Sequence, residues 1–378
     1  MDGDPNPESQ TSRPTGEVVY FYEPGELAMR EHPVPEPEPG AVVTEVVRTN
    51  VCGSDVHISE GRLGDPFVNM VLGHEAVCRV TELGPGVETD YAGNEISPGD
   101  LVAPVYYLTC QHCSACARGE FHNCQESYSY KTKSLEEFPH FHGTYGTHYY
   151  VHPNQHFYKV PDALTEVPSV AAAANCALSQ VMFGLDQVDL EYDETVVIQG
   201  AGGLGLNATA YANERGAEVI VVEGAQNRLD LARRFGADHV VDMNEYSSID
   251  ERIERVMELT DGEGADVAAE LAGVPEAFTE GIELLRTGGR YLEVGNINPG
   301  SVVDFDPGQL TRESITVEAM VQYDPWYLRK ALGFLADTID VYPYGDLLDE
   351  TYGLAEFEAA LEASAGKGVG RASLDPQS

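Results

Sequence analysis

Four cysteines lie within one fifteen-residue segment of the chain: Cys110, Cys113, Cys116 and Cys124. In a reducing compartment, four clustered thiolates complete the tetrahedral shell of a structural zinc ion, which crosslinks a loop that has no core of its own. An iron–sulfur cluster is the alternative, but the ferredoxin spacing C-x2-C-x2-C-x3-C-P is absent. With four thiols available, His112 and His122 are expected to be surface residues. We therefore predict a closed structural zinc site.

Two further cysteines and a histidine could form a second metal site, although they are far apart in the sequence. Cys52 begins the run Cys52-Gly53-Ser54-Asp55-Val56-His57, His74 follows Gly73, and Cys176 lies in an apolar helical pattern. A single cysteine in such a place is most often a small core residue, and Cys78 is assigned to the core. Two thiolates and an imidazole, however, leave one position of a zinc ion open, as in catalytic zinc sites. Cys52, His74 and Cys176 are therefore predicted to bind a catalytic zinc ion.

A glycine-rich turn follows an apolar run that is typical of a buried strand. Residues 195–199 lead directly into Gly200-Ala201-Gly202-Gly203-Leu204-Gly205, and a helical pattern follows. In this context the glycines permit a tight turn and a close approach to a pyrophosphate, and the helix N-terminus attracts phosphate. A glycine-rich turn without any ligand is the alternative. We predict that Gly200, Gly202, Gly203, Leu204 and Gly205 bind a dinucleotide.

The next predicted strand ends in an acid, Glu223, eighteen residues beyond Gly205. This is close to the spacing of about 20 residues at which an acid binds the ribose hydroxyls of NAD. A carboxylate would repel the 2′-phosphate of NADP, although the nearby Arg228 could accommodate it. We therefore expect NAD rather than NADP.

The segments around these motifs predict two domains of different kinds. Residues 17–161 contain short β-rich runs between Gly and Pro turn signals. An alanine-rich helix over about 170–185 then opens a region of alternating strands and helices, which predicts a doubly wound, Rossmann-type parallel sheet. We expect strands at 195–199, 218–223, 239–242, 265–271, 290–295 and 314–320, and helices at 203–215, 228–235, 249–260 and 276–286. The predicted organisation is a disordered tail (1–16), a β-rich catalytic domain (17–175 and 322–378) and a nucleotide domain (176–321).

Composition excludes several classes of function. The chain has 378 residues, of which 22 are Lys or Arg and 63 are Asp or Glu, giving a net charge of −41. This charge repels phosphate backbones and lipid surfaces, so no nucleic acid or membrane partner is expected. No apolar run approaches the roughly 20 residues that span a bilayer, and the first residues lack a secretory signal, so we expect a cytoplasmic protein. Self-repulsion of the acidic surface needs screening by salt, which favours a halophilic source.

With these motifs in this order, the chain resembles the zinc-dependent medium-chain alcohol dehydrogenases, and a haloarchaeal member in particular. The resemblance covers about residues 17–371 and implies a GroES-like β-rich catalytic domain beside the Rossmann domain. It also implies roles for four residues near the motifs: the acid beside the metal is Glu75, the hydroxyl group at the substrate oxygen is Ser54, the end of the proton relay is His57, and the basic residue at the pyrophosphate is Arg371. Gly53 replaces a basic residue of the animal enzymes, and glycine is common there in microbial polyol and threonine dehydrogenases.

The resemblance implies hydride transfer between an alcohol or polyol and NAD. Zinc lowers the pKa of an oxygen acid that it binds, so we expect a zinc-bound alkoxide whose proton leaves through Ser54 and the nicotinamide ribose to His57.

A homodimer or homotetramer is expected, and the strand at 314–320 could extend the sheet into a second subunit. An aldehyde-oxidising relative and a non-catalytic cofactor-binding protein are the alternatives. The segment 138–156 contains five histidines, which are expected in turns and strands at a solvated edge: His140, His142, His148, His152 and His156. No third metal ion is expected there.

Overall fold

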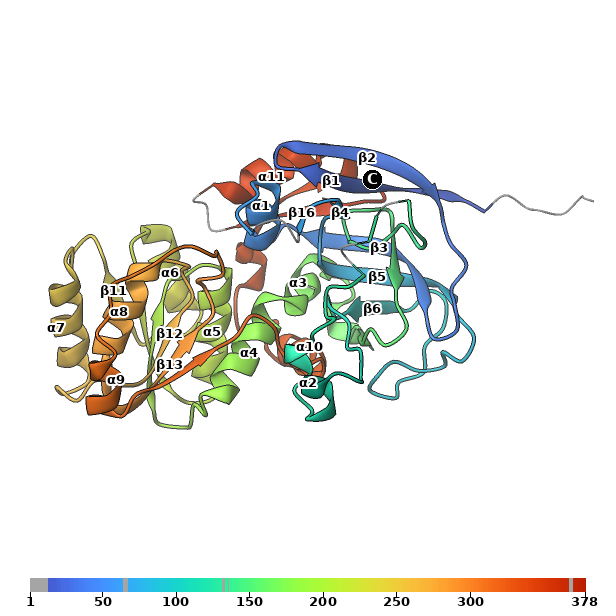
Figure 1. Ribbon diagram of the computed structural model, residues 1–378. Helices are drawn as coiled ribbons and strands as arrows, with labels where there is room; N and C mark the ends of the chain where they lie inside the picture. The colour runs from blue at the N-terminus through green and yellow to red at the C-terminus, as the bar shows by residue number, and fades with distance from the viewer. Residues whose placement is uncertain (1–12, 64–66, 131–132, 135, 367–369) are drawn as a thin grey trace, which may run out of the picture.

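The computed structural model describes residues 13–63, 67–130, 133–134, 136–366 and 370–378 (Figure 1). Most strands of the amino-terminal half form a seven-stranded sheet with the order β15-β16-β3-β5-β6-β8, in which β7 pairs with β3. A three-stranded sheet, β2-β1-β4, lies beside it. The bounds of these strands are β1 Thr15–Glu23, β2 Glu26–Pro33, β3 Val42–Asn50, β4 Met70–Val71, β5 Glu75–Leu83, β6 Leu101–Pro104, β7 His148–Val151, β8 Phe157–Lys159, β15 Leu348–Gly353 and β16 Arg371–Asp375.

The second part of the chain forms a six-stranded sheet with the order β11-β10-β9-β12-β13-β14. Every pair of neighbours in it is parallel. This confirms the doubly wound sheet, whose strand order reverses between β9 and β12. The bounds of its strands are β9 Thr195–Gln199, β10 Glu218–Glu223, β11 His239–Asp242, β12 Ala265–Glu270, β13 Leu285–Glu293 and β14 Thr316–Ala319.

Short and long helices connect and cover these sheets (Figure 1). The helices of the six-stranded sheet are α4 Ala177–Gln187, α5 Gly203–Glu214, α6 Gln226–Arg234, α7 Ile249–Leu259, α8 Pro275–Glu283 and α9 Gly308–Glu313. The other helices are α1 Gly53–Ser59, α2 Ser114–Ala117, α3 Pro168–Ala172, α10 Trp326–Thr338 and α11 Phe357–Ala365, and the 3-10 turns are η2 Phe121–Asn123, η3 Asp162–Leu164, η4 Ala173–Asn175, η5 Tyr344–Leu347 and η6 Leu354–Glu356.

One hydrophobic core joins the two sheets through α4. Val77 of β5, Leu178 and Val181 of α4 and Val196 and Ile198 of β9 belong to the same buried cluster. Each of these side chains is fully buried, and residues 177–185 of α4 are all buried, as expected for a helix that is packed on every side. The core therefore fixes the β-rich sheet and the nucleotide-type sheet against each other.

The predicted helix over 170–185 is broken, which corrects the sequence analysis. α3 and η4 end before Cys176, whose φ and ψ of −123° and −84° are not helical, and α4 begins at the next residue. The two halves meet at an angle of 43°. The break is stabilised because the Asn175 side-chain amide donates to the Pro104 carbonyl at 2.6 Å and the Ser179 hydroxyl donates to the Ala174 carbonyl at 2.6 Å. An alanine-rich sequence does not reveal such tertiary hydrogen bonds.

The first and last described strands, β1 and β16, both lie in the β-rich part of the chain. The strand β1 begins at Thr15, so the predicted disordered tail extends too far; residues 1–12 lie outside the described residues. Arg13 is already fixed, because its guanidinium donates to the Val34 carbonyl at 2.8 Å and to a Glu82 carboxylate oxygen at 2.6 Å. At the other end, β16 pairs with β3. The domain limits proposed from the sequence stay a prediction, as does the oligomeric state, for which β14 offers a sheet edge.

Among the described residues, no single helix is long and apolar enough to cross a membrane. The bent pair Pro168–Asn175 and Ala177–Gln187 meets the length and composition criteria when its two parts are taken together. Most of the residues of this pair are buried inside the protein.

Three histidines occupy places that the sequence analysis did not predict. His142 and His152 are 1% and 8% exposed rather than solvated, and their rings stack with centroids 5.6 Å apart. His122 is partly buried rather than a surface residue, because its Nδ1 lies 2.9 Å from a carboxylate oxygen of Asp324, two residues before α10. Local sequence patterns gave no indication of this burial.

The buried histidine pair predicts a specific loss of stability in acid. Burial lowers the pKa of His142 to about 4 and that of His152 to about 3, whereas the unfolded value is about 6.5. The unfolded state therefore binds more protons below about pH 6.5, so stability is complete above this pH and falls as the pH decreases.

In urea unfolding, His142→Phe should reduce the loss of unfolding free energy between about pH 7.5 and about pH 5 by about 2 kcal/mol. The exposed His239 provides a control, because His239→Gln should keep the pH dependence of the parent chain. An unchanged pH dependence in the His142 variant would contradict this account.

Candidate metal and cofactor site

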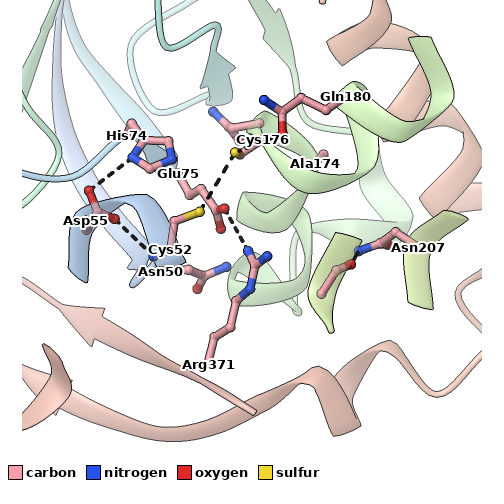
Figure 2. A network of polar contacts seen from close by, with 12 residues as sticks. Asn50, Cys52, Asp55, His74, Glu75, Ala174, Cys176, Gln180, Asn207 and Arg371 are labelled. Atoms are coloured by element: carbon pink, nitrogen blue, oxygen red, sulfur yellow. Dashed lines mark hydrogen bonds and ion pairs between the residues drawn. The ribbon is translucent and has the colours of Figure 1, made fainter. Parts of the chain in front are cut away.

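Three separate elements bring the predicted catalytic zinc ligands together (Figure 2). Cys52 follows β3 and is the N-cap of α1, His74 immediately precedes β5, and Cys176 lies at the break before α4. β3 and β5 are paired so that Asn50 lies opposite Glu75, which places the Cys52 and His74 segments side by side. The sheet register and the helix break therefore position the three residues.

The ligand atoms converge on one point. The Sγ atoms of Cys52 and Cys176 are 3.9 Å apart, and the ligand atoms of Cys52, His74, Glu75 and Cys176 all lie within 4.8 Å of one another. All four residues are buried, and all seven cysteines of the chain are free thiols. Glu75 Oε2 is buried and has no hydrogen-bond partner among the described residues. Two sulfurs, an imidazole and an unpartnered carboxylate oxygen fit a zinc ion.

The electrostatic environment favours a deprotonated thiol in this cluster. The hydrogen bond with Cys176 lowers the pKa of Cys52 well below its usual value, against the effect of burial, and the Arg371 guanidinium adds to this. Burial opposes protonation of His74, but Asp55 raises its pKa to about 10. Metal ligands must be deprotonated, so binding of zinc to this cluster should release protons.

Asp55 is a site residue that the sequence analysis missed. Its Oδ1 lies 3.1 Å from His74 Nδ1, and its Oδ2 accepts from the backbone N–H of Cys52 at 3.0 Å and from the Tyr145 hydroxyl at 3.2 Å. A carboxylate bound to the second nitrogen of a ligand histidine fixes the ring and increases its basicity. Asp55 stands within the run that begins at Cys52, so the only sequence signal was an acid three positions after a predicted ligand.

The predicted structural site is also assembled. The ligand atoms of Cys110, Cys113, Cys116 and Cys124 lie within 4.8 Å of one another. Backbone N–H groups donate to three of these sulfurs, at 3.3 Å to Cys110, 3.5 Å to Cys113 and 3.3 Å to Cys124. Such donors stabilise thiolates, and four sulfurs fit a closed zinc site. His112 is exposed, as expected.

The glycine-rich turn forms a tight connection between β9 and α5. Gly200 has a φ of +96°, and a Cβ on Gly205 would lie 1.8 Å from the Gly200 carbonyl oxygen, so a side chain is excluded there. α5 begins at Gly203 and directs its free N–H groups into the turn. Gly202, Gly203 and Leu204 line a cleft of about 670 Å³. This geometry fits the pyrophosphate of a dinucleotide.

Arg371 connects the metal cluster with this turn. Its Nη1 lies 2.7 Å from Glu75 Oε1, and its guanidinium occupies the space in which a Cβ of Gly203 would stand. The partly buried guanidinium of Arg371 thus contacts both the Glu75 oxygen and the N-terminus of α5. Coulombic attraction to Glu75 and the two thiols raises the pKa of Arg371 although burial opposes it.

Glu223 lies at the end of β10, where the sequence placed it. Its carboxylate accepts N–H groups from Ala201 at 3.0 Å, Gly224 at 2.7 Å and Ala225 at 3.0 Å. Arg228 Nη1 lies 3.6 Å from Glu223 Oε2. The acid is therefore fixed beside the glycine turn, with its charge partly compensated by the arginine.

The same cleft contains the metal cluster, the glycine turn and the predicted relay. Ser54 and His57 line it from α1, three residues apart and therefore on one face of the helix. The sequence analysis did not identify its aromatic and apolar lining, which includes Leu63, Phe67, Tyr106, Tyr128 and Val321. These residues come from separate loops, and only the tertiary fold brings them together.

Zinc content should depend on Asp55. We expect Asp55→Asn to weaken binding of the zinc ion at Cys52, His74 and Cys176 by roughly 10- to 100-fold, because the histidine loses its carboxylate partner. The measurement is zinc counted per chain during titration with a chelator.

A matched variant separates the two sites. Cys113→Ser should remove the zinc ion of the four-cysteine site and lower the melting temperature, since that ion replaces a core in the loop. If Asp55→Asn leaves the zinc affinity of the site at Cys52, His74 and Cys176 unchanged, the assigned role of the carboxylate is wrong.

Comparisons with known families identify both parts of the chain. Residues 38–162 match the model of the alcohol dehydrogenase GroES-like domain. Residues 203–337 match the model of zinc-binding dehydrogenases. The predicted GroES-like and Rossmann-type pairing is thereby confirmed.

Individual relatives agree with these matches. The chain is 32% identical over 347 residues to 5-exo-hydroxycamphor dehydrogenase of Pseudomonas putida, covering 91% of this chain and 94% of the relative. It is 33% identical over 306 residues to L-threonine 3-dehydrogenase of Pyrococcus abyssi, covering 78% and 80%. The crystal structure of an alcohol dehydrogenase of Thermotoga maritima superposes with a TM-score of 0.88 at 30% identity, covering 96% and 99%.

The comparisons do not support a haloarchaeal origin, so the halophilic source stays a prediction from charge alone. They do show the family and its cofactors. The chain belongs to the zinc-binding medium-chain alcohol dehydrogenase family and is a zinc-dependent dehydrogenase that uses NAD or NADP.

Proposed function

We propose that the chain transfers hydride between a small alcohol or polyol and NAD, with zinc at Cys52, His74 and Cys176. The observation that carries this proposal is the convergence of these ligands, with Glu75, in the same cleft as the glycine turn. The names of three relatives support the substrate class, since they refer to a hydroxycamphor, to threonine and to xylulose. The zinc ion of the four-cysteine site would be structural.

The two cofactors would supply defined chemistry when bound. A zinc ion held by the cluster would act as a Lewis acid toward an alcohol oxygen, and NAD would accept the hydride. The protein supplies the orientation of both and the path of the proton. Asp55 keeps His74 in one orientation, and Arg371 presents a positive charge at the turn where a pyrophosphate would lie.

Ser54 and His57 would move the proton. Both line the cleft, and Ser54 lies two positions after the ligand Cys52, so its hydroxyl can contact a substrate oxygen at the metal. Burial and the nearby Arg62 lower the pKa of His57, so its ring is neutral near pH 7 and able to accept a proton. His57 Nδ1 has no hydrogen-bond partner among the described residues. We therefore propose that the proton passes from the substrate hydroxyl to Ser54 and on to His57.

We propose NAD rather than NADP as the cofactor. Glu223 is held in place by three backbone N–H groups beside the turn, where the adenosine ribose of a dinucleotide would lie. A fixed carboxylate there accepts the ribose hydroxyls and repels a 2′-phosphate. Arg228 interacts with this carboxylate, which reduces the positive charge that it could offer to a phosphate.

A substrate screen tests this function. Zinc-loaded protein should reduce NAD, followed by absorbance of NADH, with at least one alcohol or polyol of a panel. His57→Gln should lower kcat roughly 100-fold at about pH 7 and less at higher pH, where solvent base replaces the histidine. His239→Gln, on the surface, should keep the kcat of the parent enzyme.

Two other outcomes would change the proposal. Oxidation of aldehydes to acids, without oxidation of alcohols, would favour the aldehyde-oxidising alternative. Binding of NAD without turnover of any alcohol or aldehyde would indicate a non-catalytic protein.

A further inference from the structure

Two loops at the carboxyl edge of the parallel sheet form part of the cleft wall. The loop after β12 contributes Leu271, Ala272 and Gly273, and the loop after β13 contributes Val294, Gly295, Ile297, Asn298 and Pro299. The first loop touches the glycine turn, because a Cβ on Gly200 would lie 2.8 Å from the Ala272 Cβ. Since β10 carries Glu223 on the adenosine side, the β12–β13 side of the switch point faces the nicotinamide half of a dinucleotide.

A buried carboxylate holds both loops. Glu270, the last residue of β12, is fully buried, and its Oε1 accepts N–H groups from Ala272 at 2.8 Å and Gly273 at 2.6 Å. Its Oε2 accepts from the Asn296 side-chain amide at 3.1 Å. One side chain thus fixes the loop after its own strand and contacts the next loop.

The second loop is tied to a second acid through the same asparagine. Both the backbone N–H and the side-chain amide of Asn296 donate to Glu293 Oε1, at 3.2 Å and 3.1 Å. Glu293 is the last residue of β13. Glu270, Asn296 and Glu293 therefore form one connected unit, which we term the carboxyl clasp.

Gly295 shows how closely the two loops meet. A Cβ at this position would lie 2.4 Å from Glu270 Oε2 and 2.5 Å from the Gly273 nitrogen. Position 295 therefore has no room for a side chain, because the Glu270 carboxylate lies there between the loop after β12 and the loop after β13. The shape of the cleft wall at Gly295 depends on the clasp.

Glu270 and Glu293 bind the same amide nitrogen of Asn296, so their carboxyl groups lie close together. Two such groups are stable side by side only when one of them carries a proton. Burial, followed by the hydrogen bond and charge of Glu270, raises the pKa of Glu293 to about 7. When both carboxylates are charged, they repel each other at low dielectric.

Among the described residues, the groups nearest the pair are neutral or already paired with another residue. The phenol of Tyr291 on β13 faces it, and burial raises the pKa of that phenol far above its usual value, so it stays neutral. On α8, Glu280 is bound by Arg252 through both oxygens. β9 contributes the neutral Gln199. The other charged groups on the packed elements are Asp186 of α4, Glu276 and Glu283 of α8, Arg312 and Glu313 of α9, Glu318 of β14, and Asp266, Arg286 and Arg290 at the other ends of β12 and β13.

We propose that the carboxyl clasp positions the two loops that receive the nicotinamide half of the cofactor, and that a proton on Glu293 keeps them closed. The inference rests on the proposed function, since it takes the ligand of the cleft to be a nicotinamide dinucleotide. Glu270 and Glu293 are positioning residues, because they act through the loop backbone rather than on the reacting atoms. Loss of the Glu293 proton should separate the loops and weaken cofactor binding.

Calorimetric titration with NAD tests the clasp without turnover. For the parent protein, the Kd for NAD should rise about fivefold or more between about pH 6 and about pH 8.5 at constant ionic strength. Glu293→Gln keeps a neutral hydrogen-bond donor beside Glu270, so its Kd should be independent of pH over this range. Glu318→Gln, on the neighbouring strand β14, is the matched control and should keep the pH dependence of the parent protein.

A second probe needs no variant. ADP-ribose lacks the nicotinamide, so its Kd for the parent protein should not change over the same pH range. Equal pH dependence for NAD and ADP-ribose, or an unchanged pH dependence in a folded Glu293→Gln protein, would overturn the proposal. Failure to bind either ligand at every pH would instead overturn the assignment of the cleft to a dinucleotide.

Discussion

The whole arrangement depends on the convergence of Cys52, His74 and Cys176 on one point. The two cysteines are 124 positions apart, yet their sulfurs are 3.9 Å apart. This distance requires the pairing of β3 with β5, the helix break at Cys176 and the packing of α4 between the two sheets. If any of these failed, two thiols and an imidazole would be buried without a common partner, which costs stability.

Charge compensation connects the metal cluster to the cofactor turn. Glu75 is fully buried, and burial raises its pKa to about 8, while Arg371, which lies 2.7 Å away, opposes this rise. Arg371 enters from β16, the strand with which the end of the chain returns to the β-rich sheet, and it lies against Gly203 at the start of α5. One ion pair thus joins the metal cluster, the cofactor turn and the carboxyl-terminal segment. This explains why a residue nearly 300 positions from Glu75 belongs to the same site.

Sequence patterns predicted the parallel sheet well because most of its strands contain a short apolar run next to turn signals; β13 is different, since it contains Gly288 and Gly289 and begins at Leu285. The predicted strand 195–199 and the end of the strand at Glu223 agree with the structure. The metal cysteines and the glycine turn were also predictable, because their chemistry requires particular residue types at particular spacings. The break at Cys176 was not, since tertiary hydrogen bonds override an alanine-rich helical pattern. The same reason applies to the burial of His142 and to the contacts of Asp55 and Glu270, which arise only when distant segments pack together.

Anomalous diffraction at the zinc edge from crystals of the zinc-loaded protein tests the central claim most directly. The account predicts two peaks per chain. One should lie about 2.3 Å from the Sγ atoms of Cys52 and Cys176 and about 2.0 Å from a ring nitrogen of His74, and the other should lie among the four sulfurs of the segment 110–124. A single peak at the four sulfurs, or a second ion bound without one of Cys52, His74 and Cys176, would contradict it.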